Sequence, residues 1–168
     1  MVKNGRMRKL MLMELSGIET LPEVIGDLEV FEELRLTGNQ LLSIPHSIGN
    51  LRKLKILKLS FNNLRKIPDS IGDLTELETL SCYNNRLVSV PETIGKLKSL
   101  EHLGLGNNSL SRLSGSISSL KNLKSLGIIK NKFTSFPSEI CHLISLIHVS
   151  ASYNKISRFQ IVYVIFYR

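Results

Sequence analysis

The stretch that decides the fold is LKILKLSFNNLRKIPDSIGDLTE, residues 54–76. It reads LxxLxLxxNxLxxIPxxIGxLxx, and related stretches recur every 23 residues along nearly the whole chain. Leu57 and Leu59 flank Lys58, which is the period-two pattern of a short strand with one buried face. A fixed interval of this length predicts a stack of similar turns, each packed against its neighbours.

Seven copies are predicted, beginning at residues 8, 31, 54, 77, 100, 123 and 146. They make residues 1–168 a single domain that finishes in a degenerate C-terminal turn, 157–168. Each copy supplies one strand, placed about 4.8 Å from the next in a parallel sheet. The expected fold class is therefore α/β: a right-handed solenoid or horseshoe with a parallel concave sheet and short helical or 3-10 segments on the convex side.

The ninth position of the copies is occupied by an amide side chain, which can both donate and accept hydrogen bonds. Stacked amides could satisfy backbone groups in a tight bend, so these residues are predicted to be structural. Ser16 takes this place in the first copy. The predicted ladder consists of Asn39, Asn62, Asn85, Asn108, Asn131 and Asn154.

Proline and glycine mark the convex segments, as at Pro68 and Gly72. Proline fixes φ where its missing N–H breaks no ladder, and glycine eases a sharp return to the next strand. The fifth copy has Ser114 and Ser118 at these places, and the sixth has Cys141 at the glycine position. A looser convex backbone is expected in those two copies.

The formal charge of +8 and a pI near 9.7 suit an anionic partner. Along the sequence, however, the basic residues are spread out, which favours an ordinary solvated surface and argues against nucleic acid. The two cysteines, Cys82 and Cys141, have no metal-binding spacing and are predicted to be buried free thiols. No metal site and no cofactor site is expected.

The motifs of common catalytic sites, HExxH, GxSxG, GxxxxGK[ST] and GxGxxG, do not occur. The acidic residues fall mainly on convex segments, where they are not arranged in pairs for acid/base work. His102 and His148 are two repeats apart, so they are not expected to share a metal ion. The chain is therefore predicted not to be an enzyme.

The in-register copies with their LPxxIGxL connection resemble leucine-rich-repeat proteins with 23-residue units. The resemblance covers about residues 8–166 and extends to leptospiral and other bacterial proteins implicated in host attachment and virulence. It implies non-catalytic protein binding on the concave sheet, as a bacterial adhesin or effector that is secreted or held at the outer surface. The alternatives are a cytoplasmic signalling scaffold of the Ras-suppressor or LAP type, and a polyanion binder.

Strand alternation identifies the outward positions as the third, fifth, seventh and eighth of each copy. In the first copy these are Leu10, Leu12, Glu14 and Leu15. Aromatic and cationic side chains around small residues are typical of interface hot spots. The predicted partner-binding residues are Arg35, Lys58, Phe61, Tyr83, Asn84, His102, Asn107, Ile129, Lys130, His148 and Tyr153.

Both ends of a solenoid need a cap or a partner. The apolar residues 161–167 are too few to span a bilayer, and the first 17 residues lack the apolar run of a secretory signal. The C-terminal tail is expected either to fold over the last turn or to pair with another chain, giving a monomer or a dimer. The expected partner of the concave face is a protein, for instance one on a host-cell surface.

Overall fold

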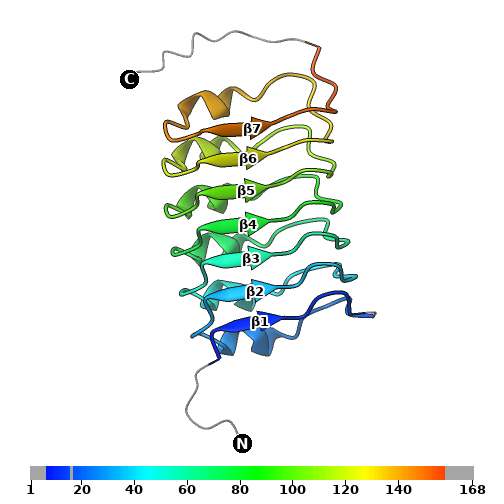
Figure 1. Cartoon of the computed structure of the whole chain (residues 1–168), viewed down its shortest axis with the longest axis vertical. Coiled ribbons are helices and arrows are strands. Elements are labelled where there is room, and N and C mark those ends of the chain that lie inside the picture. The colour runs from blue at the N-terminus through cyan, green and yellow to red at the C-terminus, as the bar shows by residue number, and fades with distance from the viewer. Residues whose placement is uncertain (1–6, 16, 158–168) are drawn as a thin grey trace, which may run out of the picture.

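The computed structural model describes residues 7–15 and 17–157. Seven three-residue strands alternate with six five-residue 3-10 helices and form one parallel sheet in the order β1 to β7 (Figure 1). The strands are β1 (Lys9–Met11), β2 (Glu33–Arg35), β3 (Ile56–Lys58), β4 (Thr79–Ser81), β5 (His102–Gly104), β6 (Ser125–Gly127) and β7 (His148–Ser150). The helices are η1 (Glu23–Asp27), η2 (His46–Asn50), η3 (Asp69–Asp73), η4 (Glu92–Lys96), η5 (Gly115–Ser119) and η6 (Ser138–His142).

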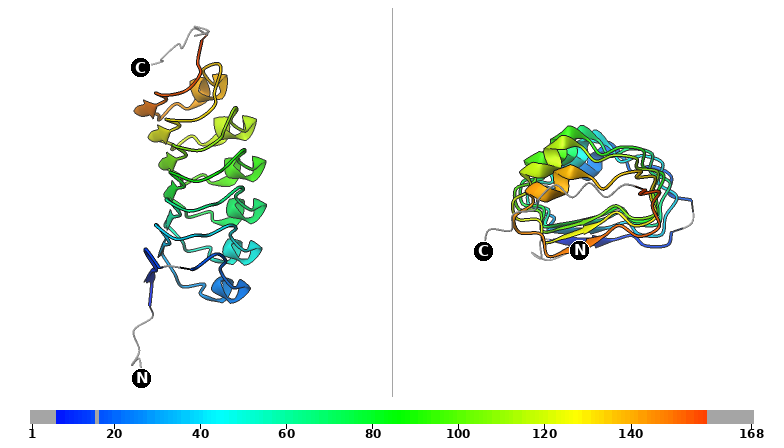
Figure 2. Two further views of the ribbon diagram at one scale, coloured as in Figure 1. Left: turned by 90° about the vertical axis from the view of Figure 1, so that its right-hand side faces the viewer. Right: turned by 90° about the horizontal axis from the view of Figure 1, so that it is seen from above.

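Figure 2 shows the sheet on one side of the stack and the 3-10 helices on the other. Between these layers runs a column of leucines that are at most 2% exposed: Leu34, Leu57, Leu80, Leu103 and Leu126. Consecutive leucines are register partners in the sheet, so each repeat adds one rung. The predicted α/β solenoid is thereby confirmed.

The first repeat departs from the predicted register by one residue. Leu10 pairs with Leu34, at an interval of 24 residues instead of 23. The backbone N–H of Gln40 donates to the Ile18 carbonyl, as that of Asn63 donates to the Leu41 carbonyl, so the 23-residue interval returns after the turn. One extra residue lies between the strand and this point, where Gly17 has a positive φ of 93°. The first copy therefore begins at residue 7, and its outward positions are not Leu10, Leu12 and Leu15.

The asparagines tie each repeat to the preceding one. In the third repeat the Asn62 side-chain nitrogen donates to the carbonyls of Leu36 (2.8 Å) and Leu59 (3.0 Å). Its side-chain oxygen accepts from the backbone N–H of Leu41 at 3.0 Å. The same three kinds of bond recur at Asn85, Asn108, Asn131 and Asn154. Asn39 differs, because its oxygen accepts from Leu15, and Ser16 lies outside the described residues.

Proline precedes five of the 3-10 helices with φ between −64° and −70°. In the fifth repeat Ser114 replaces it, and its side chain accepts from the Ser116 backbone N–H, which is an ordinary N-cap. Helix η5 keeps the five-residue length of the others. The irregularity expected in the fifth copy is therefore absent from this helix. In the sixth copy, where it was also expected, Pro137 has ψ of 118° against 151–156° for the other four prolines.

The two thiols differ in their surroundings. Cys82 is fully buried at a leucine position of the core, and burial raises the pKa of its thiol to about 12. The prediction that both are buried is wrong for Cys141, which lies within helix η6 of the sixth repeat and is half-exposed.

Native alkylation should therefore modify Cys141 and spare Cys82, because the thiolate is the reactive species and Cys82 stays protonated and covered. Peptide mass spectrometry after brief iodoacetamide treatment at pH 8 measures this. Cys82 should become labelled only after unfolding in urea. Equal labelling of both thiols in the native protein would contradict the buried position of Cys82.

Candidate functional site: the concave face

The concave face is the outward side of the sheet and of the turns that follow each strand. The eighth position of every repeat, the last residue before the ladder asparagine in repeats two to seven, has a positive φ. Its occupants are Glu14, Gly38, Phe61, Asn84, Asn107, Lys130 and Tyr153. This left-handed backbone is disfavoured for residues with a Cβ, and for bulky side chains it costs on the order of 1 kcal/mol or more. Two exposed aromatic residues nevertheless occupy it.

Phe61 and Tyr83 form an aromatic pair on the concave face. Their ring centroids are 5.5 Å apart in an edge-to-face arrangement, and Phe61 is 51% exposed. The Tyr83 ring and the Ile129 side chain lie over Gly106, where a Cβ would come within 3.0 Å of the ring and 2.7 Å of Ile129. Gly106 thus makes room for both side chains, which come from repeats on either side of it.

Tyr153 is 75% exposed, and the Lys130 ammonium nitrogen lies 5.6 Å from the centroid of its ring. Between these groups the Asn107 side chain donates to the side-chain oxygen of Asn84. The structure therefore brings six of the predicted residues into three neighbouring pairs: Phe61 with Tyr83, Asn84 with Asn107, and Lys130 with Tyr153.

Of the other five predicted residues, Ile129 follows β6 and the remaining four lie in the strands. Lys58 stands in register between Arg35 and Ser81, and His102 and His148 begin β5 and β7 with Ser125 between them. No group of three metal-ligating side chains occurs among residues 7–15 and 17–157. The two histidines are exposed and separated by a whole strand.

Arg35 is engaged within the protein. Its guanidinium contacts the Glu33 carboxylate, which also lies 3.2 Å from the Lys9 ammonium group. The hydrogen bond from Arg35 and the nearby Lys9 hold the pKa of Glu33 below its ordinary value. From β3 to β7, by contrast, none of the described concave positions carries a carboxylate. The open part of the face therefore has lysines and histidines with no opposing charge.

The corrected register of the first copy places Lys9, Met11 and Met13 at outward positions that the 23-residue interval does not indicate. Met11 and Met13 extend the concave face at β1 and are 62% and 43% exposed, whereas Leu10 and Leu12 pack against the core. The additional glycine, Gly17, was the available signal of an extra residue in that turn. Methionine suits adaptable binding surfaces, so the first strand adds an apolar end to the candidate site.

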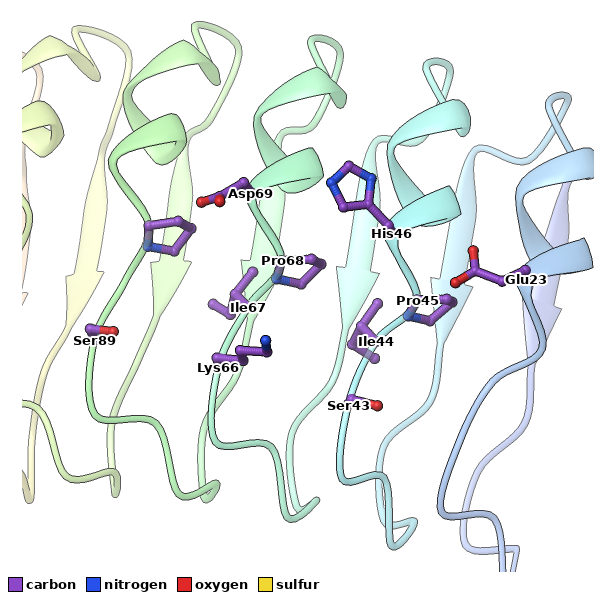
Figure 3. A pocket seen from close by; sticks show the side chains of 11 residues that line it. Glu23, Ser43, Ile44, Pro45, His46, Lys66, Ile67, Pro68, Asp69 and Ser89 are labelled. Atoms are coloured by element: carbon purple, nitrogen blue, oxygen red, sulfur yellow. The ribbon is translucent and has the colours of Figure 1, made fainter.

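A separate hollow of about 570 Å³ lies beside the first three 3-10 helices (Figure 3). Glu23, His46 and Asp69 line up at the starts of these helices, beyond the row formed by Pro45 and Pro68. Glu23 accepts a hydrogen bond from the Ser47 backbone N–H at 3.1 Å, and hydrogen bonding by Ser47 lowers the pKa of Glu23. This row joins successive helices and has no constellation for acid/base catalysis.

Residues 2–101 match the family described as a leucine-rich repeat region, and together with the solenoid geometry this shows that the chain belongs to the leucine-rich-repeat family. This fold is generally a non-catalytic module for protein interaction. Within the described part of the chain, no helix combines the length and the apolar character needed to cross a bilayer.

The chain is similar to a leucine-rich-repeat protein of Leptospira interrogans, with 33% identity over 88% of this chain and 43% of that one, and a TM-score of 0.66. It is also similar to the ectodomain of the Arabidopsis thaliana receptor kinase GASSHO1/SCHENGEN3, solved in complex with Casparian strip integrity factor 2: 29% identity, 89% and 18% coverage, TM-score 0.80. For the type III effector XopL the values are 25% identity, 94% and 55% coverage, and a TM-score of 0.79. The chain thus spans less than two thirds of each of these structures. No curated protein matches it.

Proposed function

We propose that the chain is a non-catalytic module that captures a protein partner on its concave face, and that it acts as a bacterial adhesin or effector. The observation that carries the binding site is the aromatic pair Phe61–Tyr83, in which Phe61 is exposed and is kept in a left-handed backbone conformation while Tyr83 is half-exposed. Backbone strain of this kind persists at binding sites because the surrounding structure fixes it. A partner would gain a large apolar contact with little loss of side-chain freedom.

The similarity to the Leptospira protein and to a type III effector supports the bacterial, host-directed role. The expected partner is a host protein, and secretion or display at the outer surface fits that role. A cytoplasmic scaffold is the alternative. Fractionation of the native cells separates the two proposals, because only an exported protein reaches the medium or the outer membrane.

Replacing Phe61 by Asn together with Tyr83 by Ala should reduce partner capture at least thirtyfold, because hot-spot aromatics contribute about 2 kcal/mol or more. Stability should change little, since asparagine accepts a left-handed backbone more readily than phenylalanine does. Cross-linking pull-down from host-cell surface extract, quantified against wild type, measures capture. Val24→Asn, an exposed apolar change on η1, is the control. Unchanged capture by a folded double variant would exclude the aromatic pair as the contact.

The C-terminal end bears on the assembly state. An apolar hollow of about 280 Å³ lies there beside η6 and β7, and Ile144 and Ile147 are exposed next to it. The two predicted coverings, the chain's own tail and a second copy, involve residues 158–168, which lie outside the described residues. Sedimentation of the full chain distinguishes them, because only the second copy doubles the mass.

A further inference from the structure

The basic residues that are scattered in the sequence gather along one edge of the solenoid. This basic edge consists of Arg65, Lys66, Arg86, Arg112, Lys132 and Lys155, all exposed and all within four residues after a ladder asparagine. The stretches that contain them, 63–68, 86–91, 109–114, 132–137 and 155–157, hold no Asp or Glu. With these six set aside, the other 16 of the 22 Lys and Arg residues nearly balance the 14 Asp and Glu. Most of the net charge therefore belongs to this edge.

Backbone hydrogen bonds fix the order of the charges. The N–H groups of Arg86, Lys132 and Lys155 donate to the carbonyls of Leu64, Leu110 and Phe133 in the preceding repeats, at 2.7–2.9 Å. Repeats in parallel register are about 4.8 Å apart, so Arg86 and Lys132, two repeats apart, stand roughly 10 Å from each other along the edge. Arg65, Lys66 and Arg112 stand at the twelfth or thirteenth position of their repeats, so the six cations together form a band across five successive repeats.

The side chains of the basic edge make no ion pair and no hydrogen bond within the described structure. The four ion pairs found among the described residues involve Arg8, Lys9, Arg35 and Lys124, and none includes a cation of the basic edge. Lys98 and Lys121, elsewhere in the solenoid, donate to carbonyls of the following repeat, whereas no edge cation makes such a side-chain bond in the described structure. The six charges are free to meet an external anion.

Acidic residues limit this edge on its convex side. Glu23, Asp69, Glu92 and Glu139 lie in the first turns of their 3-10 helices. Figure 3 shows Lys66 at the level of Ser43 and Ser89, with Asp69 and Glu23 beyond the prolines. An anionic chain would be repelled from the helices and confined to the band of cations.

The neighbouring side chains indicate the kind of anion. Between the cations stand the exposed hydroxyls of Ser89, Ser111, Thr134 and Ser135. Single-stranded nucleic acid is ordinarily held by aromatic platforms interleaved with cations, and the exposed positions of the basic edge in the described repeats have none. A membrane surface would require an apolar face beside the charges, and Val88 is the exposed large hydrophobic residue within these stretches. Hydroxyls and unpaired cations in a band suit an extended sulfated or carboxylated polysaccharide.

We propose that the basic edge binds a linear anionic polysaccharide, in a contact that is separate from the concave face. Heparin is the probe. Titration calorimetry at 50 mM salt should show binding that weakens steeply by 200 mM salt, as for other contacts made by many charges. Arg86→Gln with Lys132→Gln should reduce the affinity about tenfold, since two of the six charges are removed from one band.

The matched control is Arg52→Gln with Lys53→Gln. It also removes one guanidinium and one ammonium group, but at the opposite end of the strands, where both residues are exposed. It should change the affinity less than twofold, and thermal melting should show both variants folded. Equal weakening by the two variants, no binding of heparin by wild type, or tighter binding of polyuridylate or phosphatidylserine vesicles than of heparin would each overturn the proposal. The Phe61/Tyr83 variant should bind heparin normally, so failure here is separable from failure of the protein-binding function.

Discussion

Asn62→Ala should lower the free energy of unfolding by about 2–4 kcal/mol, because a buried backbone group left without a partner costs about 1–3 kcal/mol and several bonds are lost together. Asn62 is 7% exposed, and its oxygen accepts the hydrogen bond from the Leu41 backbone N–H. Alanine cannot replace that acceptor, and the cavity it leaves lies between two repeats. The Leu36 carbonyl keeps the hydrogen bond from Asn39, so the orphaned N–H dominates the loss.

Equilibrium unfolding in urea, followed by circular dichroism, measures the effect. The neighbouring Asn63→Ala is the control: this side chain is half-exposed and makes no side-chain hydrogen bond within the described structure, while its backbone N–H bond to Leu41 is retained. Its expected change is below about 0.5 kcal/mol. Similar losses at both positions would mean that the ladder does not hold the repeats together.

Gly72→Ala should destabilise the protein by about 2–3 kcal/mol through overpacking. A Cβ at Gly72 would lie 2.6 Å from the Thr93 carbonyl oxygen and 2.7 Å from the Thr93 Cβ in the next 3-10 helix. The obstructing oxygen belongs to the backbone, so no side-chain rotation relieves the contact and the two repeats must move apart. Gly26, Gly49 and Gly95 face the following repeat with the same closeness, 2.6–2.7 Å.

Gly115→Ala provides the comparison, because a Cβ there would meet nothing within 4 Å. Alanine restricts the unfolded chain to fewer conformations than glycine does, so this substitution should stabilise the protein by up to about 1 kcal/mol. Differential scanning calorimetry of the two variants should show shifts of Tm in opposite directions. A Tm for Gly72→Ala equal to that of wild type would show that the helices can separate freely.

The repeat interval made the sheet, the core column and the asparagine turns predictable, because each depends on side-chain periodicity alone. The prediction of the register from this interval failed in the first repeat, where the interval itself changes. The first strand belongs to a continuous apolar run, Leu10 to Met13, which accepts either register equally well because both faces carry large apolar side chains. Only the hydrogen bonds to the second repeat settle that Met11 and Met13 point outward.

The charges illustrate a different limit. Arg65, Arg112 and Lys155 are separated by tens of residues, so the sequence presents them as dispersed. They occupy the twelfth, thirteenth and tenth positions of their repeats, all in the stretch that follows the ladder asparagine. The solenoid stacks these stretches side by side, so the gathering appears only when the repeats are compared with one another. The pairing of Arg35 with Glu33 was less hidden, because strand alternation places the third and fifth positions of a copy on the same face.

The column of left-handed residues at the eighth position has a consequence for variation. Glycine, asparagine, lysine, glutamate, phenylalanine and tyrosine all adopt this conformation in successive repeats, so hydrogen bonding between the turns, not the side chain, imposes it. Mutation can therefore replace the side chains exposed at the eighth positions while the backbone of the solenoid stays the same. Such a row would let descendants of this chain acquire new specificities by single substitutions.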